Sequence, residues 1–191
     1  MNILELDKFI ENIQNGFPGI FQTDTLPALS AKPEFCDQIW NLKKRSKNKP
    51  LILMGASSEE LFDSIDEKVL DDAIRMSKKY WPGPLTLVLP CREEKSIYLN
   101  HLKDSIGLRV PNSQVAISLL KKTGPLATTS ANLSGVTPSL DISKISKDFP
   151  NVPFLGPIPW TDCSFQASTV IKWISKGNWT ILRKGSIIPK I

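Results

Sequence analysis

The stretch Leu126-Ala127-Thr128-Thr129-Ser130-Ala131-Asn132-Leu133-Ser134-Gly135 begins as an apolar segment and continues as a run of small hydroxyl and amide residues. We expect a strand over 126–129 that opens directly into a polar loop. Hydroxyl and amide groups beside fixed positive charge are suited to binding a polyphosphate. The stretch therefore predicts a ligand cradle, although an ordinary turn is the simpler interpretation of the loop taken alone.

A second segment supplies the positive charge: five of the seven residues are cationic in Lys43-Lys44-Arg45-Ser46-Lys47-Asn48-Lys49. Lys43 and Arg45 lie where an expected helix gives way to a loop, so their charged groups could converge on one anion. The alternative is a solvated helix end whose cations only complement the helix dipole. The two segments together favour an anionic ligand.

Helical and strand patterns alternate on both sides of these segments. The spacing of apolar residues predicts helices over 3–15, 33–44, 67–80 and 113–122. Strands are expected over 19–22, 51–54, 85–89, 106–110 and 126–129, and a hairpin over 168–174 and 179–183. This alternation predicts one α/β domain over residues 1–191, built on a twisted mixed sheet flanked by helices.

Composition excludes several kinds of chemistry. The chain has 191 residues and a formal charge of +5, which favours anionic partners. Its three cysteines are widely spaced and His101 is its one histidine, so a disulfide framework, a zinc site or a histidine-dependent hydrolase is not expected. There is no GxxxxGK[ST] or GxGxxG fingerprint. The acidic N-terminal residues and the lack of a long apolar run predict a cytoplasmic protein with no membrane partner.

Two arginines stand in strand-like surroundings. Arg109 lies between apolar residues, where a buried arginine needs an anionic partner. Strand alternation places it opposite Leu108 and Val110, so a solvent-facing position is the alternative to a ligand contact. Arg183 precedes Gly185, which would allow close approach of a ligand or form only a turn. Asp24, between two threonines, could hold a metal or an ammonium group, or form an Asx-turn.

The ordered set of motifs resembles the YrdC/TsaC family of threonylcarbamoyl-AMP synthases. It comprises Thr23-Asp24-Thr25, Lys43-x-Arg45, Trp81-Pro82-Gly83-Pro84-Leu85-Thr86, Gly107-Leu108-Arg109-Val110-Pro111, Ser130-Ala131-Asn132-Leu133-Ser134-Gly135, Ser168-Thr169-Val170 and Leu182-Arg183-x-Gly185. The resemblance runs from about residue 20 to 186. It implies the family's YrdC-like sheet with a basic concave cavity, and no C-terminal domain of the kind found in longer relatives.

The resemblance also implies a reaction. L-Threonine, bicarbonate and ATP would give threonylcarbamoyl-adenylate and pyrophosphate, for threonylcarbamoyladenosine modification of tRNA. ATP would be a substrate, accompanied by Mg²⁺ held mainly by phosphates and water, with no metal-binding residue in the protein. tRNA and the downstream threonylcarbamoyl-transfer proteins would be indirect partners. The substrate carbamate would attack the α-phosphate, so no protein nucleophile would be needed.

Residue by residue, the resemblance implies two groups of contacts. Threonine or the intermediate would contact Thr25, Arg109, Ser130 and Ser168. Nucleotide and phosphates would contact Lys43, Arg45, Lys49, Asn132 and Arg183. Lys43 and Arg45 would be the catalytic residues, both facing the cavity, so that replacing either by alanine would abolish turnover with little loss of folding.

The chain departs from the family where the usual PTDTVYGL-like run reads Gln22-Thr23-Asp24-Thr25-Leu26-Pro27-Ala28-Leu29, which changes the wall beside Thr25. The main alternative function is a non-catalytic RNA-binding module that uses the basic cavity. A second alternative is an enzyme that forms carbamoyl-adenylate from carbamoyl phosphate, as in hydrogenase maturation. The zinc-finger and acylphosphatase segments usual in those proteins are not found here.

Overall fold

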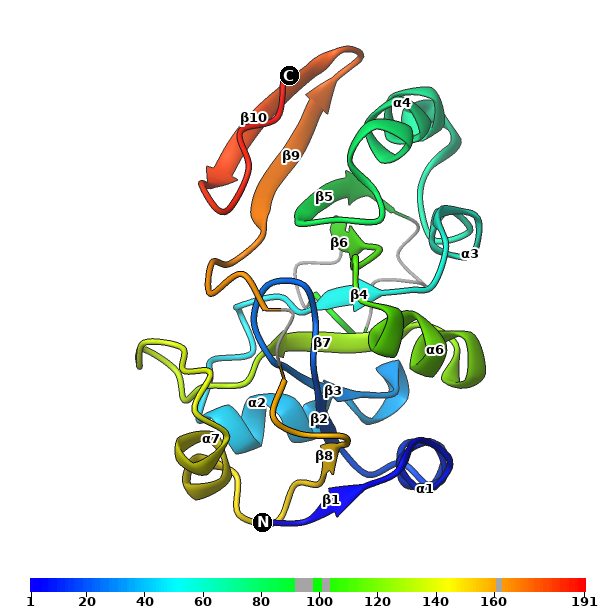
Figure 1. The fold of residues 1–191 in the computed structure, drawn as a ribbon. Coiled ribbons are helices and arrows are strands. Elements are labelled where there is room, and N and C mark those ends of the chain that lie inside the picture. The colour runs from blue at the N-terminus through cyan, green and yellow to red at the C-terminus, as the bar shows by residue number, and fades with distance from the viewer. Residues whose placement is uncertain (92–97, 101–103, 161–162) are drawn as a thin grey trace.

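The computed structural model describes residues 1–91, 98–100, 104–160 and 163–191, and within them the strands join in one ten-stranded mixed sheet (Figure 1). The order across the sheet is β1-β8-β2-β3-β7-β4-β6-β5-β9-β10. The strands are β1 (Ile3–Leu4), β2 (Gly19–Phe21), β3 (Ala28–Ala31), β4 (Ile52–Met54), β5 (Leu85–Pro90), β6 (Ser105–Arg109), β7 (Leu126–Ser130), β8 (Phe154–Leu155), β9 (Thr169–Ser175) and β10 (Asn178–Arg183).

Helices pack on this sheet and connect its strands. The α-helices are α1 (Leu6–Gln14), α2 (Asp37–Lys43), α3 (Ser58–Phe62), α4 (Leu70–Tyr80), α6 (Gln114–Thr123) and α7 (Ile142–Asp148), and the 3₁₀ helices are η1 (Pro33–Phe35) and η2 (Glu67–Val69). The two termini lie at opposite ends of the molecule, the C-terminus beside the β9–β10 hairpin (Figure 1). In the described parts of the chain, no helix is both long and apolar enough to cross a membrane.

The two faces of the sheet are covered by different sets of residues. One face bears the larger apolar core, in which Leu53, Leu108 and Ile171 pack with residues of α2 and α4. A smaller core around α1 and α6 covers part of the opposite face, where it includes Met54. The remainder of that second face carries Arg109 and other polar residues. Side chains alternate between the faces of a strand, so the sequence position of each residue fixes the face on which it lies.

The predicted mixed α/β sheet is confirmed, with small shifts at the ends of its elements. The helix expected over 3–15 begins only at Leu6, because Ile3–Leu4 pairs with β8 as a strand. The helix expected over 33–44 is the 3₁₀ turn η1 followed by α2, and it ends at Lys44, which has a left-handed backbone with φ of 50°. The helix expected over 67–80 likewise begins as the 3₁₀ turn η2.

Sequence reasoning missed several short elements: β1, β3, β8, α3 and α7. β3 is buried along its whole length between β2 and β7, so it shows no alternation of apolar and polar residues. β8 has two residues in a proline-rich passage. α3 had a readable signal, because Ser57 and Glu60 form a capping box at its start.

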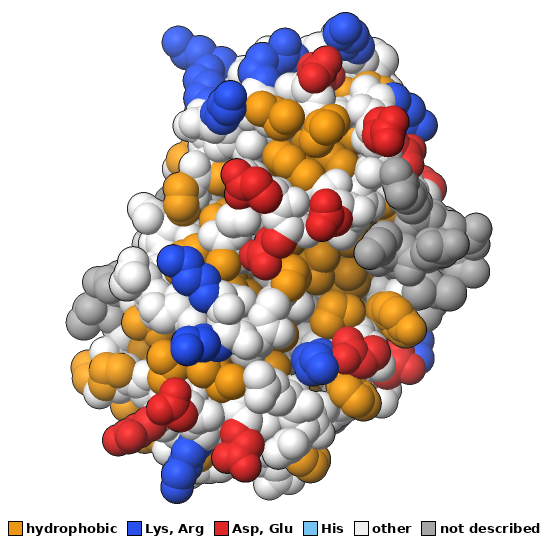
Figure 2. Space-filling model, turned by 90° about the vertical axis from the view of Figure 1, so that its right-hand side faces the viewer, with side chains coloured by type: hydrophobic (Ala, Val, Ile, Leu, Met, Phe, Trp, Pro, Cys, Tyr) orange, Lys and Arg blue, Asp and Glu red, His pale blue; other side chains and the backbone are white. Residues whose placement is uncertain are grey.

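The helix-covered side of the molecule carries charged side chains of both signs. In Figure 2, basic and acidic side chains are interspersed over this side with apolar groups between them, and lysines and arginines gather toward its upper end. The concentration of positive charge that matters for a ligand lies instead in the cavity described below.

Candidate functional site

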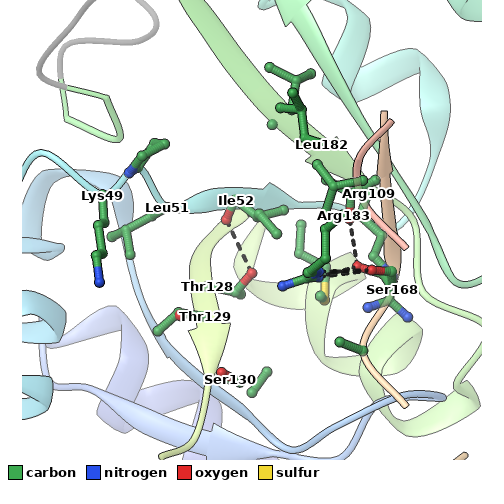
Figure 3. A pocket seen from close by; sticks show the side chains of 18 of the residues that line it. Lys49, Leu51, Ile52, Arg109, Thr128, Thr129, Ser130, Ser168, Leu182 and Arg183 are labelled. Atoms are coloured by element: carbon green, nitrogen blue, oxygen red, sulfur yellow. Dashed lines mark hydrogen bonds between the residues drawn. The ribbon is translucent and has the colours of Figure 1, made fainter. Parts of the chain in front are cut away.

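A cavity of about 570 Å³ occupies the part of the sheet that α1 and α6 leave uncovered. Its lining comes from both halves of the sheet and from the loops after β2, α2 and β7 (Figure 3). Among the described lining residues, Arg45, Lys49, Arg109, Lys172 and Arg183 are cationic and Asp104 is acidic. The excess of positive charge in a partly enclosed site favours an anionic ligand.

Arg109 lies at the end of the central strand β6 and is only 4% exposed. Its Nη2 donates to Asp24 Oδ1 at 2.6 Å, its Nη1 to Thr25 Oγ1 at 2.8 Å, and its Nε to the Gly83 carbonyl at 3.1 Å. Burial lowers the pKa of Arg109, and the charge of Asp24 opposes this shift. The guanidinium is therefore held rigidly, and the solvent-facing alternative for this residue is wrong.

The loop after β2 provides two of the three partners of Arg109, Asp24 and Thr25. Thr23 Oγ1 donates to the Leu26 carbonyl at 2.7 Å, and the Thr25 amide donates to Thr23 Oγ1 at 3.1 Å. These bonds fix a tight loop in which Thr25 lines the cavity and is 2% exposed. Asp24 Oδ1 pairs with Arg109 Nη2 at 2.6 Å, so this carboxylate balances the charge of the buried arginine.

A second polar cluster joins β5, the start of β9 and the end of β10. Ser168 Oγ lies 2.9 Å from Thr86 Oγ1, and Arg183 Nη2 lies 3.1 Å from Ser168 Oγ. The Nε and Nη2 of Arg183 also donate to the Ser168 carbonyl, at 3.2 and 2.9 Å. All three side chains line the cavity. Thr86 was missed as a site residue, although it belongs to the motif that contains Trp81 and Pro82.

We define the mouth of the cavity as the part lined by the more exposed cations Arg45, Lys49 and Arg183, and its inner end as the part around the buried Arg109 and Thr25. Arg45 is half-buried and donates from Nη2 to the Pro50 carbonyl at 3.1 Å, whereas Lys49 is exposed. Burial, and then the positive charge of Arg183, lower the pKa of Arg45. Arg45 and Arg183 therefore repel each other, and an anion placed between them would relieve this repulsion.

Lys43 does not face the cavity, so that expectation is wrong. It is 1% exposed, and its Nζ donates to the carbonyls of Ser130 and Asn132, each at 2.5 Å. Helix α2 packs Ile39 and Trp40 into the core on the other face of the sheet. Lys43, at the end of this helix, therefore lies behind the part of the cavity wall that Ser130 forms. Burial, and then the charge of Arg45, lower the pKa of Lys43 to about 8.

Asn132 is also absent from the cavity lining, while Ser130 is part of it. The side-chain Nδ2 of Asn132 donates to the carbonyls of Leu133 and Val136 at 2.9 and 2.7 Å, and its Oδ1 accepts from Ser130 Oγ at 2.5 Å. The side chain is thus committed to holding its own loop. The predicted nucleotide contact at Asn132 has no counterpart in this arrangement.

Other expectations concern cysteine, histidine and metal chemistry. Cys36, Cys91 and Cys163 are all buried. His101 lies outside the described residues. Within the described residues, His, Cys, Asp and Glu side chains form no group of three that could hold a metal ion.

The comparison with protein families identifies the family to which the chain belongs. The Sua5/YciO/YrdC family model, described as "Telomere recombination", matches residues 11–185. The chain belongs to this family. The resemblance inferred from the ordered motifs is therefore confirmed for nearly the whole chain.

Curated relatives in this family carry the name threonylcarbamoyl-AMP synthase. The protein from Klebsiella pneumoniae is 39% identical over 114 residues, which cover 59% of this chain and 60% of that protein. The one from Pyrococcus abyssi is 31% identical over 72% of this chain and 41% of its own length. The one from Blochmanniella floridana is 32% identical over 76% of this chain and 83% of its own length. The chain thus spans less than two thirds of the first two relatives.

Solved structures of the same family share the fold. The structure described as P. abyssi Sua5 complexed with L-threonine has a TM-score of 0.86 and 26% identity, and the match covers 97% of this chain and 58% of that one. E. coli YciO has a TM-score of 0.77 and 22% identity, over 94% of this chain and 88% of that one. The YrdC-like architecture expected from the motifs is therefore confirmed.

Proposed function

We propose that this Sua5/YciO/YrdC protein is a threonylcarbamoyl-AMP synthase. It would convert L-threonine, bicarbonate and ATP into threonylcarbamoyl-adenylate and pyrophosphate. The observation that carries the proposal is one cavity with a buried arginine and threonine at its inner end and separate cations at its mouth. The names of the relatives, and the L-threonine in the P. abyssi Sua5 complex, support it. We take residues 1–191 as one catalytic domain, because a single sheet runs through the described chain.

The inner end of the cavity suits an amino acid. Arg109 uses three of its five N–H donors on Asp24, Thr25 and Gly83, and within the described part of the chain the other two have no protein partner. A threonine carboxylate placed there would receive charge-assisted hydrogen bonds from a group already fixed in position. Thr25, Ser130 and Ser168 would supply partners for the substrate's hydroxyl and for the carbamate.

The mouth of the cavity suits a nucleotide phosphate chain. Arg45, Lys49 and Arg183 line it and provide the charge that phosphates require. The described residues offer no cluster of carboxylates, which fits an Mg²⁺ ion held by the phosphates and water. Bound in that way, the ion would neutralise charge on the phosphates. The protein itself would orient the α-phosphate toward the inner end.

The reaction then needs positioning more than acid–base groups. The amino nitrogen of threonine takes up the carbon of bicarbonate to form a carbamate, with loss of water. A carbamate oxygen attacks the α-phosphorus, and the bond from that phosphorus to the pyrophosphate oxygen breaks. Arg45 and Arg183 would stabilise the charge that develops on the phosphates, and the enclosed cavity would hold the two substrates in line.

The product would supply threonylcarbamoyl groups to the proteins that modify tRNA. The activated mixed anhydride is prone to hydrolysis, so a partly enclosed site that limits access of water suits this role. Direct contact with tRNA is not required by the chemistry. Binding of RNA without formation of the adenylate is the result that would favour the RNA-binding alternative.

The proposal is tested by turnover of the purified protein with ATP, Mg²⁺, bicarbonate and L-threonine, L-serine or no amino acid. Pyrophosphate release and the adenylate are followed, the latter by mass spectrometry. We expect threonine- and bicarbonate-dependent product, and the serine reaction reports whether the Leu26-Pro27-Ala28 wall still allows discrimination. No adenylate from a folded protein, together with salt-dependent binding of RNA, would replace the synthase with a binding module.

Arg45→Ala is the informative variant in this assay. We expect it to lose most turnover at subsaturating ATP and to keep its thermal stability, because Arg45 lines the mouth and is only half-buried. Lys47→Ala is the matched control, since Lys47 belongs to the same basic segment but forms an exposed ion pair with Asp37 and lies outside the cavity lining. Equal losses in both variants would mean that the segment acts only through its general charge.

A further inference from the structure

Lys43 is a buried cation, and in the described part of the chain its charged group bonds to backbone carbonyls. Its Nζ donates to Ser130 O and Asn132 O, and its own carbonyl accepts from the Ser134 amide at 3.0 Å. Within the described residues, Lys43 forms no ion pair. Both ends of this residue therefore bind the same short segment, which we define as the 130–136 loop.

The loop carries further bonds that fix its shape. The side-chain Nδ2 of Asn132 donates to the Leu133 and Val136 carbonyls, and Ser130 Oγ donates to Asn132 Oδ1. The Ala131 amide donates to the Pro27 carbonyl at 2.8 Å, which joins the loop to the segment that contains Thr25. Lys43 and the Asn132 side chain thus both bond to backbone carbonyls of the loop, Lys43 to those of Ser130 and Asn132 and Asn132 to those of Leu133 and Val136.

The cavity depends on this loop although Lys43 does not line it. Ser130 and its neighbours Thr128 and Thr129 line the cavity at the end of β7. Figure 3 shows them along one strand, opposite Arg183 and Ser168. A shift of the Ser130 carbonyl away from Lys43 would move the Ser130 hydroxyl in the wall, because both belong to the same residue.

We propose that Lys43 is a positioning residue, whose ammonium group clamps the 130–136 loop and thereby places Ser130 in the wall of the cavity. Arg45, two residues later in the chain, provides the charge that faces the nucleotide. Within the basic segment, Lys43 thus holds the backbone of the protein, whereas Arg45 binds the ligand. The kinetic part of this proposal rests on the proposed synthase function, whereas its structural part does not.

The structural part is tested without substrate by backbone hydrogen exchange in Lys43→Met. Methionine keeps an unbranched side chain of similar size but has no donor for the two carbonyls. We expect the amides of Asn132, Ser134 and Val136 to exchange about tenfold faster or more, as for loss of hydrogen bonds from a charged donor. Arg45→Ala should leave these amides unchanged. Unchanged exchange in Lys43→Met would overturn the clamp, whatever the protein's activity.

The kinetic part is tested by comparing Lys43→Met with Arg45→Ala. We expect Lys43→Met to lower kcat and raise KM for threonine while KM for ATP stays within about twofold. Arg45→Ala should chiefly raise KM for ATP. Because Lys43 and Asn132 hold the same loop, Lys43→Met and Asn132→Ala together should cost little more than either alone. A rise in KM for ATP in Lys43→Met equal to that in Arg45→Ala would show that Lys43 contacts the nucleotide.

Lys43→Gln is a second variant, to be used if Lys43→Met does not fold. Lys43→Gln keeps N–H donors on a side chain one bond shorter, so it should restore folding and give intermediate values of amide exchange and of KM for threonine. Wild-type exchange and kinetics in a folded Lys43→Gln protein would contradict the need for the ammonium group. Absence of adenylate in the wild type would reject the proposed function and leave the exchange result as the test of the clamp.

Discussion

Arginines lie at both the inner end and the mouth of the cavity, but they differ in burial and in the groups to which they bond. At the inner end, Arg109 is 4% exposed and is fixed by three hydrogen bonds, one of which is also its ion pair with Asp24. At the mouth, the partners of Arg45 and Arg183 among the described residues are backbone carbonyls and one hydroxyl, and Lys49 is exposed. The inner charge is already in position for a small carboxylate. The outer charges can adjust to a longer and more highly charged ligand.

This contrast predicts the largest loss for Arg109→Ala. We expect kcat/KM for threonine to fall about a hundredfold or more, because the variant removes the carboxylate's partner and leaves Asp24 without its ion pair. Asp24→Asn is the comparison variant: it keeps Arg109 and should lose less. Steady-state kinetics with threonine as the varied substrate measure both. A loss of less than tenfold in folded Arg109→Ala would remove the inner end as the amino-acid site.

The second prediction concerns Asp72, a carboxylate remote from the cavity that bonds to the hairpin carrying Arg183. Asp72 on α4 is 4% exposed and accepts from the Gly177 amide and from the Trp173 indole, each at 2.7 Å. These bonds fix the β9–β10 hairpin that carries Arg183. We expect Asp72→Asn to lower the free energy of unfolding by about 2 kcal/mol, measured by urea titration. A change below about 0.5 kcal/mol would show that the hairpin is held by packing alone.

The same carboxylate predicts a dependence on pH. Burial alone would raise the pKa of Asp72, but hydrogen bonds from Gly177 and Trp173 and the charges of Arg75 and Lys176 lower it overall. A carboxyl whose pKa is lower in the folded state stabilises it above the unfolded pKa, about 3.9, and loses this contribution as pH falls through the folded pKa. The wild type should therefore lose stability below about pH 4 more steeply than Asp72→Asn. Parallel curves would contradict this role.

Arg183→Ala should have a smaller effect on catalysis than the change at the inner end. We expect KM for ATP to rise about tenfold, the usual size for loss of a charged hydrogen-bond donor to a phosphate. Lys184→Ala is the matched control, because Lys184 is exposed and lies outside the cavity lining. The two variants are compared at saturating threonine. Equal KM values for ATP would exclude Arg183 from the nucleotide site.

The smallest effect is expected for Lys49→Ala. An exposed lysine contributes a screened charge, so KM for ATP should rise only about two- to threefold, and the difference from wild type should disappear at high ionic strength. Arg109→Ala should keep its full loss under the same conditions, because its site is buried. A loss in Lys49→Ala that persists at high salt would place Lys49 in direct, dry contact with the ligand.

Particular residues show how far sequence reasoning reached and why it stopped. Strand alternation correctly placed Arg109 opposite Leu108 and Val110, but it did not say whether that face meets solvent, a core or a cavity. The motifs identified Thr25, Ser130, Ser168 and Arg183, all of which line the cavity. They did not separate Lys43 from Arg45, because both are cations at the end of the same helix. Thr86 was missed, since one threonine in a strand carries no signal until Ser168 lies beside it.

The sequence by itself determined the order of the elements, the two faces of each strand and the set of charged and hydroxyl groups. These follow from local periodicity and from residue chemistry, which do not depend on distant parts of the chain. Only the tertiary structure decided which groups meet. Asp24 and Arg109 are 85 residues apart and yet form a buried ion pair, whereas Lys43 and Arg45 are two residues apart and serve different surroundings. The physical reason is that the partner and the burial of a side chain are set by how the sheet brings remote strands together.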